Sequence, residues 1–281
     1  MRVRYEFSSK KTRKSRKPSN TNKHNVAFPA QVLKVIDTSE IILEVLDARF
    51  IDKTRNLEIE KEILRQGKKL ILILNKIDLV DLKEFKQNTE LASLKPYVMF
   101  SSKSKIGKKR LKDVLKIEVK KLKMTRKARI GIIGYPNTGK SSLINALVGS
   151  KVSGTSKESG FTTSVNKIRL NKDVFILDTP GVIPEKEIYE TRRGDFKKHV
   201  QMGVRTYDKI KDPDFIVADI MKENPGQLEE HYKIDANGDS EVLLEGLALR
   251  YNFKKKGGIP DLERAARLIV MDFQKGEIKA K

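Results

Sequence analysis

The chain has 281 residues, which is long enough to bury a sizeable core and suits one large domain with a smaller domain or a tail. It contains no cysteine, which excludes disulfides, thiolate zinc sites and cysteine nucleophiles. Lysine and arginine number 59 against 37 aspartates and glutamates, and the resulting net charge of +22 favours a polyanionic partner, above all nucleic acid.

The positive charge is concentrated in residues 1–17, 103–127 and 192–198. A solvated Lys/Glu-rich surface of the kind that thermophile proteins carry is the alternative interpretation, but it does not explain so unequal a balance. Aromatic residues are few and tryptophan is absent, so phosphate contacts rather than base stacking are expected, with no DNA sequence specificity. The longest apolar run, residues 70–74, is far shorter than the ~20 residues of a membrane span, so no membrane partner is expected.

Residues 1–27 lack apolar periodicity and are predicted to form a basic, mobile N-terminal arm. Residues 28–190 alternate between short apolar runs typical of buried parallel strands and stretches with helical apolar spacing. The predicted strands are residues 40–48, 68–76, 97–102 and 128–134, the predicted helices are residues 56–66, 82–94 and 140–148, and a hairpin-like pair spans residues 166–181. This alternation predicts an α/β sheet fold.

Strand signals vanish after about residue 193, and helical spacing appears at residues 215–221, 242–253 and 262–273. The sequence therefore predicts a helical domain over residues 191–281. Asp212, Ser240 and Asp261 are the predicted N-caps of its helices.

A phosphate-binding motif lies between the predicted strand 128–134 and the predicted helix 140–148. Gly134, Gly139, Lys140 and Ser141 fit the pattern G-x-x-x-x-G-K-[ST]. In this pattern, backbone N–H groups close around the phosphates, the lysine lies by the β and γ phosphates, and the hydroxyl binds Mg²⁺. The other residues of this stretch expected to contact the nucleotide are Asn137, Thr138 and Ser142.

Asn75, Lys76 and Asp78 match the pattern N-K-x-D at the end of another predicted strand. The Asp78 carboxylate can accept hydrogen bonds from guanine N1–H and from the 2-amino group, whereas adenine offers neither donor in that geometry. The stem of Lys76 can lie across the base. One strand later, Ser101, Ser102 and Lys103 resemble an S-A-K loop, in which a backbone N–H meets guanine O6.

Asp178 and Gly181 match D-x-x-G after an apolar run. In this motif the aspartate holds Mg²⁺ through water, and the glycine N–H meets the γ-phosphate. Thr162 is the residue favoured to complete the Mg²⁺ shell. Thr163, or an ordinary Ser/Thr-rich surface loop, is the alternative interpretation.

The order of these loops is unusual. In the guanine-nucleotide switch proteins that the motifs resemble, the phosphate loop comes first and the base loop near the end, whereas here residues 75–78 and 101–103 precede residues 134–142. A circular permutation accounts for this, because the termini of a compact domain often lie close enough for a new surface connection to join them. The basic helix predicted after Lys103 is that connection, and the loops still share the carboxyl edge of one sheet.

The motif order, together with Asp47, Ala48 and Arg49 in the sequence VLDARF, resembles the YlqF/RbgA-like family of circularly permuted ribosome-assembly GTPases and its archaeal and nucleolar relatives. The family's D-A-R-x-P lacks its proline here. Residues 254–278 also resemble that family's C-terminal domain, so the resemblance covers nearly all of residues 28–281. It implies a circularly permuted P-loop GTPase fold followed by a small α-helical domain that binds RNA.

The resemblance also implies GTP and GDP with Mg²⁺ as cofactors. The implied partners are a large ribosomal subunit precursor and its rRNA, with GTP hydrolysis timing release. The implied location is the cytoplasm, or the nucleolus in a nucleated cell.

No catalytic residue is identified. Val182 stands where many GTPases carry a water-orienting glutamine, and it has no hydrogen-bonding group, so slow intrinsic turnover is expected. Asn137 resembles the asparagine that helps to hold K⁺ in potassium-activated GTPases, with an ordinary loop residue as the alternative. His24 could reach the site from the arm, with a solvated histidine as the alternative.

Other classes of function remain open. One is an RNA-binding chaperone with a vestigial GTP site. Another is a P-loop enzyme acting on a small substrate, which is disfavoured because no phosphoacceptor base is recognisable and N-K-x-D indicates guanine.

Overall fold

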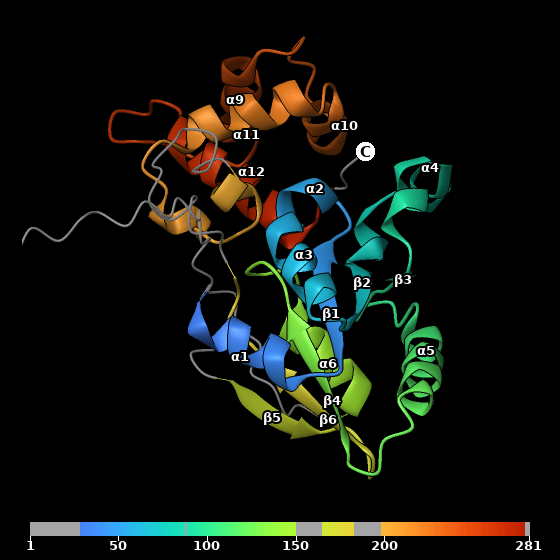
Figure 1. Cartoon of the computed structure of the whole chain (residues 1–281). Helices are drawn as coiled ribbons and strands as arrows, with labels where there is room; N and C mark the ends of the chain where they lie inside the picture. The colour runs from blue at the N-terminus through green and yellow to red at the C-terminus, as the bar shows by residue number, and fades with distance from the viewer. Residues whose placement is uncertain (1–28, 88, 150–164, 183–197, 279–281) are drawn as a thin grey trace, which may run out of the picture.

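The computed structural model describes residues 29–87, 89–149, 165–182 and 198–278. The predicted arm with His24 lies outside the described residues, as do Thr162 and Thr163. We refer to residues 29–182 as the sheet unit and to residues 198–278 as the helical unit (Figure 1).

The sheet unit contains one sheet with the strand order β3-β2-β1-β4-β6-β5. Its strands are β1 (Ile41–Asp47), β2 (Lys69–Asn75), β3 (Tyr97–Met99), β4 (Ala128–Ile133), β5 (Asn166–Arg169) and β6 (Val174–Asp178). All neighbouring strands pair in parallel except β5 and β6, which form an antiparallel hairpin. Every residue of β1 is buried, because helices cover both faces of the sheet.

The two faces of the sheet follow the period-2 alternation of strand side chains. In β1 and β2, odd-numbered residues such as Leu43 and Ile73 pack with α5 (Lys108–Lys121) and α6 (Lys140–Val148). Even-numbered residues of the same strands, such as Ile42 and Leu74, pack with α1 (Ala30–Thr38), α3 (Leu57–Arg65) and the 3₁₀ turn η2 (Thr89–Leu94). The remaining elements of the sheet unit are α2 (Ile51–Thr54), η1 (Ile77–Leu79) and α4 (Leu82–Gln87).

The helical unit contains η3 (Tyr207–Lys209), α9 (Pro213–Glu223), α10 (Gln227–Tyr232), α11 (Ser240–Arg250) and α12 (Leu262–Lys275). These helices enclose an apolar core of their own, which includes Val217, Leu244 and Ile269. Figure 1 shows the group at one end of the molecule, with α12 beside α2 of the sheet unit. The rings of Phe50 and Phe273 join the two units, with centroids 5.9 Å apart.

Some predicted elements differ from the structure. The predicted helix 82–94 is α4 followed by the separate turn η2, because this stretch of the sequence includes Asn and Thr, which have low helix propensity. Ser240 was predicted as an N-cap, but it is the first helical residue of α11. Asp239 caps that helix instead, because its carboxylate accepts from the N–H groups of Glu241 at 2.8 Å and Val242 at 3.4 Å.

The connectivity agrees with a permuted order. The chain leaves the edge strand β3, passes through the basic helix α5 and returns to β4 beside the central β1. The loops after β2 and β3 are thus completed before the loop after β4 begins. Among the described residues, the helices are all too short or too polar to span a bilayer.

Candidate nucleotide-binding site

The predicted site residues lie in loops at the carboxyl edge of the sheet, where ligands bind in open α/β sheets. The base loop 75–78 follows β2, the loop 101–103 follows β3, the phosphate loop 134–139 follows β4, and the loop 178–182 follows β6. Strand register brings Asn75 level with Asp47, and Asp178 level with Ile132. Thr162 lies outside the described residues and its predicted role stays a prediction.

A direct hydrogen bond joins the base loop to the phosphate loop. Nδ2 of Asn75 donates to the carbonyl of Thr138 at 2.7 Å, and both residues are buried. Gly139 has φ 95°, and a Cβ there would overlap Nδ2 of Asn75, so only glycine allows this approach. The chain order of the loops therefore does not prevent them from forming one site.

Lys140 begins α6, and its side chain is almost wholly buried. Its Nζ donates to the carbonyls of Gly134 and Tyr135, both at 3.0 Å, which holds the ammonium inside the curve of the loop. Burial lowers the pKa of Lys140 to about 8, and the nearby Asp178 carboxylate offsets part of that effect. Ser141 and Ser142 follow in the first turn of α6, half-buried.

The loop after β6 is tied to the same strand and loop. Thr179 donates its hydroxyl to the carbonyl of Ile132 at 2.8 Å, and the N–H of Val182 donates to the carbonyl of Gly134 at 3.1 Å. A Cβ at Gly181 would come within 2.8 Å of Cα of Pro136, so the two loops are in close contact. The side chain of Val182 is buried in the core against α1 and α3, and its lack of a chemical role stays a prediction.

The base loop makes a sharp turn at Lys76, whose φ of 62° is left-handed. The N–H of Ile77 then donates to the carbonyl of Phe100 at 3.2 Å, which ties the base loop to the loop after β3. In that loop Ser101 is buried and accepts from the N–H of Ser104 at 3.0 Å, while Ser102 and Lys103 are exposed. Asp78 is half-buried in η1, beside Lys76.

Asp47 at the end of β1 connects these loops electrostatically. Its carboxylate is fully buried and accepts from Nζ of Lys76 at 2.7 Å and from Nη2 of Arg49 at 2.9 Å. Burial alone would raise the pKa of Asp47, but the Lys76 ammonium and the Arg49 guanidinium outweigh it and hold that pKa far below its usual range. The position of Lys76 is therefore set by Asp47.

Arg49 also reaches the helical unit. Its Nη1 donates to the carbonyl of Phe273, in the last turn of α12, at 3.1 Å. Gly276, just beyond α12, lies so close to Leu79 that a Cβ would overlap its side chain. The end of α12 thus contacts both the arginine that pairs with Asp47 and the residue that follows Asp78.

The phosphate loop contacts the helical unit as well. Nδ2 of Asn137 donates to the carbonyl of Gly203 at 2.5 Å. Gln274 of α12 holds that turn by donating to the carbonyls of Val200 at 2.7 Å and Arg205 at 2.9 Å. Both halves of the candidate site therefore contact the helical unit through side chains.

The sequence did not predict the connecting role of Asp47 and Arg49. It identified these residues only as part of a motif shared with the YlqF/RbgA-like family. The available signal was an acidic residue at the end of a buried strand, the same placement that singled out Asn75 and Asp178. The contact between Asn137 and Gly203 had no signal, because it joins residues 66 positions apart.

Comparison with known proteins supports the interpretation of this site as a GTP-binding site. The family model described as a 50S ribosome-binding GTPase matches residues 129–239, beginning at the strand before the phosphate loop. A GTP-binding protein of Methanocaldococcus jannaschii is 34% identical over 251 residues, which is 88% of this chain and 65% of the relative. GTPase grn1 of Schizosaccharomyces pombe is 30% identical, over 90% of this chain and 61% of its own.

Solved structures agree with the sequence relatives. GNP-bound YlqF from T. maritima superposes with a TM-score of 0.59 at 25% identity, covering 89% of this chain and 94% of that one. A GDP-bound YlqF structure gives a TM-score of 0.60 at 27% identity, covering 88% and 95%. The chain is a homologue of the YlqF-like GTP-binding proteins. The predicted circularly permuted GTPase fold with a helical C-terminal region is confirmed, and the chain spans less than two thirds of the length of the curated relatives named above.

The buried ammonium of Lys140 predicts pH-dependent nucleotide binding. Its pKa of about 8 means that the free protein loses this proton as the pH rises through that value, whereas a bound polyphosphate favours the charged form. GTP affinity should therefore fall with rising pH in this range, with proton uptake on binding, as measured by calorimetry in buffers of different ionisation enthalpy. Lys140→Arg, which stays charged, is the control: the same proton uptake in that variant would contradict the assignment.

The buried cluster around Asp47 predicts a combined effect on stability and nucleotide affinity. Arg49→Ala removes one of the two cations that compensate a fully buried carboxylate, and should lower the free energy of unfolding by roughly 3–5 kcal/mol. GTP affinity should fall too, because the Asp47 carboxylate that positions Lys76 loses the guanidinium that holds both of its oxygens. Arg65→Ala removes an exposed ion pair with Glu62 and should change neither quantity much. Urea unfolding and fluorescent-nucleotide titration measure both, and unchanged GTP affinity in Arg49→Ala would refute the positioning role.

Proposed function

We propose that this protein binds and hydrolyses GTP, and that it binds a large ribosomal subunit precursor through rRNA, with hydrolysis timing its release. The main support is the hydrogen bond from Asn75 to the carbonyl of Thr138, which joins the loop that we propose to select guanine to the loop that we propose to bind phosphates. The family description of a 50S ribosome-binding GTPase and the net charge of +22 support the ribosomal partner.

The donor set fits Mg²⁺. This ion prefers hard oxygen ligands and is usually held by one or two protein groups together with substrate phosphates. The hydroxyl of Ser141 and the buried carboxylate of Asp178 supply such oxygens, and no larger cluster of acidic or histidine side chains occurs in the described parts of the chain. Bound there, the ion would neutralise charge on the β and γ phosphates. We propose Thr162 as a further ligand.

Asn137 has a divided role in this proposal. Its amide nitrogen is committed to the carbonyl of Gly203 at 2.5 Å, so its amide oxygen is the atom that we assign to K⁺. Loss of that ion would therefore also disturb a contact with the helical unit.

The helical unit is the proposed rRNA-binding part. It follows the loop 178–182, which we assign to the γ-phosphate, and it contacts the site at Arg49 and at Asn137. A change at the γ-phosphate would therefore alter contacts that hold the helical unit in place. We propose that this is how hydrolysis releases the particle, in the cytoplasm, or in the nucleolus of a nucleated cell.

The guanine assignment is tested by Asp78→Asn. The variant should lose GTP affinity by roughly 2 to 4 kcal/mol, because a bidentate charged contact is removed, and it should favour xanthosine triphosphate, whose 2-oxo group requires a donor. Competition titrations with GTP, xanthosine triphosphate and ATP measure the three affinities. Equal GTP affinity in the variant and the parent would remove Asp78 from the base site.

The switch function is tested by single-turnover GTP hydrolysis with each ribosomal subunit. Because the side chain of Val182 is buried in the core, the isolated protein should turn over on the order of once per minute or less. Large-subunit particles with K⁺ should raise the rate about tenfold or more, by ordering groups around the γ-phosphate. Small subunits should have no effect, and Lys140→Ala should abolish turnover.

Other outcomes distinguish the remaining functions. GTP binding and RNA binding without hydrolysis under any condition would indicate a chaperone with a vestigial site. Fast hydrolysis by the protein alone, unaffected by subunits or by K⁺ in place of Na⁺, would indicate an ordinary enzyme with a complete catalytic group.

A further inference from the structure

Helix α5 is the connection that the permuted chain order requires, and one side of it is strongly basic. Leu111 and Leu115 are buried and anchor the helix against α6 and the sheet. Its start is fixed as well, because a Cβ at Gly107 would overlap the carbonyl of Met99 in β3. The helix is therefore held rigidly, with a fixed face toward solvent.

The solvent face carries lysines at spacings of three and four residues, which places them along one line. These lysines, the α5 stripe, are Lys109, Lys112, Lys116 and Lys120. All are exposed, and no ion pair involves them among the described residues. Glu118 is outside the stripe and is paired with Lys121 at 2.8 Å, so it does not neutralise these lysines. The exposed Asp113 is the one carboxylate of α5 on the same face, so the stripe carries four positive charges against one negative charge.

The stripe extends over roughly 16 Å at 1.5 Å per residue, and successive lysines are about 5–6 Å apart. A regular row of unpaired ammonium groups on a rigid support suits a partner with regularly repeated negative charge. Figure 1 shows α5 at the side of the sheet unit, away from α9–α12. A polyanion on α5 would thus meet a surface separate from the helical unit.

We propose that the α5 stripe binds the phosphate backbone of rRNA, as a second contact besides the helical unit. This inference rests on the proposed function. It adds that the connector created by the permutation is itself part of the ribosome-binding surface. Because α5 directly follows the loop 101–103, it would also place RNA close in the chain to the loop assigned to guanine O6.

Matched substitutions test the stripe in the full chain. The first variant carries Lys112→Gln, Lys116→Gln and Lys120→Gln, which keep helix propensity and remove charge. The control variant carries Lys34→Gln, Lys61→Gln and Lys69→Gln, exposed lysines of α1, α3 and β2 whose loss changes the net charge equally. Unchanged GTP affinity in both variants shows that the fold is intact.

Binding is measured with a fluorescein-labelled RNA hairpin at several salt concentrations. The stripe variant should lose about tenfold or more in affinity, and the slope of log K against log salt should become shallower by about two, since each phosphate contact contributes roughly 0.7–0.9. The control variant should lose little. Equal losses in both variants would overturn the inference while leaving the proposed function intact, whereas a parent protein with no salt dependence would overturn the proposed function itself.

A third variant distinguishes an RNA contact of α5 from a protein contact. Ile117 is 53% exposed beside the stripe, and Ile117→Ser removes apolar surface without changing charge. Binding to large-subunit particles should survive this substitution and should be weakened by the lysine variant. The reverse result would assign α5 to a protein contact and refute the RNA contact.

Discussion

The buried carboxylate of Asp47 is the interaction on which the arrangement of this site depends. Burying a charge costs several kcal/mol unless it is well compensated, and a buried ion pair is often no more stabilising than an apolar replacement. Asp47 is compensated by Lys76 and Arg49, whose cations lie within 3 Å of its oxygens at 2.7 and 2.9 Å. Its contribution is therefore best understood as positional, because it fixes a base-loop lysine and aims an arginine at the carbonyl of Phe273.

The place of β1 explains why the permuted order leaves the site intact. β1 lies between β2, which supplies the base loop, and β4, which supplies the phosphate loop. The two loops meet over its carboxyl end, where Asn75 donates to Thr138. This geometry depends on which strands are adjacent in the sheet. It does not depend on whether β1 and β2 come before or after β4 in the chain. The permutation required one surface connection, which is α5.

The sequence predicted the sheet unit well, because buried parallel strands and phosphate loops are local patterns. It predicted the loops Asn75 to Asp78 and Gly134 to Ser142 at strand ends, where the structure has them. It missed α1, α2 and α10, which are short or weakly patterned and whose helical form depends on tertiary packing. It also missed the contacts of Arg49 and Asn137, because a hydrogen bond to a distant backbone carbonyl leaves no periodicity in the sequence.

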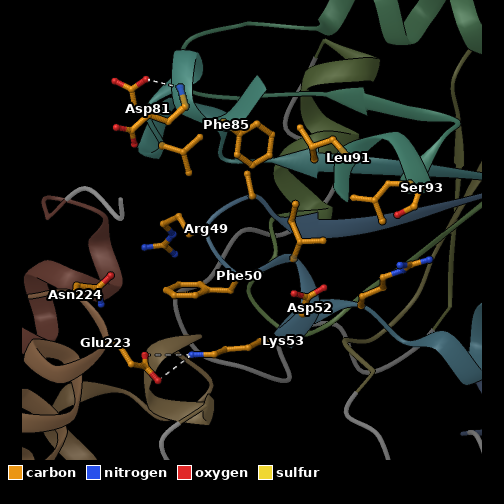
Figure 2. A pocket seen from close by; sticks show the side chains of 16 residues that line it. Arg49, Phe50, Asp52, Lys53, Asp81, Phe85, Leu91, Ser93, Glu223 and Asn224 are labelled. Carbon is orange, nitrogen blue, oxygen red and sulfur yellow. Dashed lines mark hydrogen bonds and ion pairs between the residues drawn. The ribbon is translucent and has the colours of Figure 1, made fainter. Parts of the chain in front are cut away.

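The two units are joined by polar contacts as well as by the rings of Phe50 and Phe273. Each unit has its own apolar core, and Phe50 is the partly buried sheet-unit residue that packs against the helical core within the described chain. The other contacts include Lys53 with Glu223, at 3.3 Å and about one third exposed, and the hydrogen bonds of Arg49 and Asn137. The ion pair of Lys53 with Glu223 (Figure 2) is partly hydrated and can be exchanged for water at low cost, whereas the buried Arg49 and the apolar cores cannot. Under the proposed function, the helical unit would change its position by exchanging contacts of this kind rather than by opening either core.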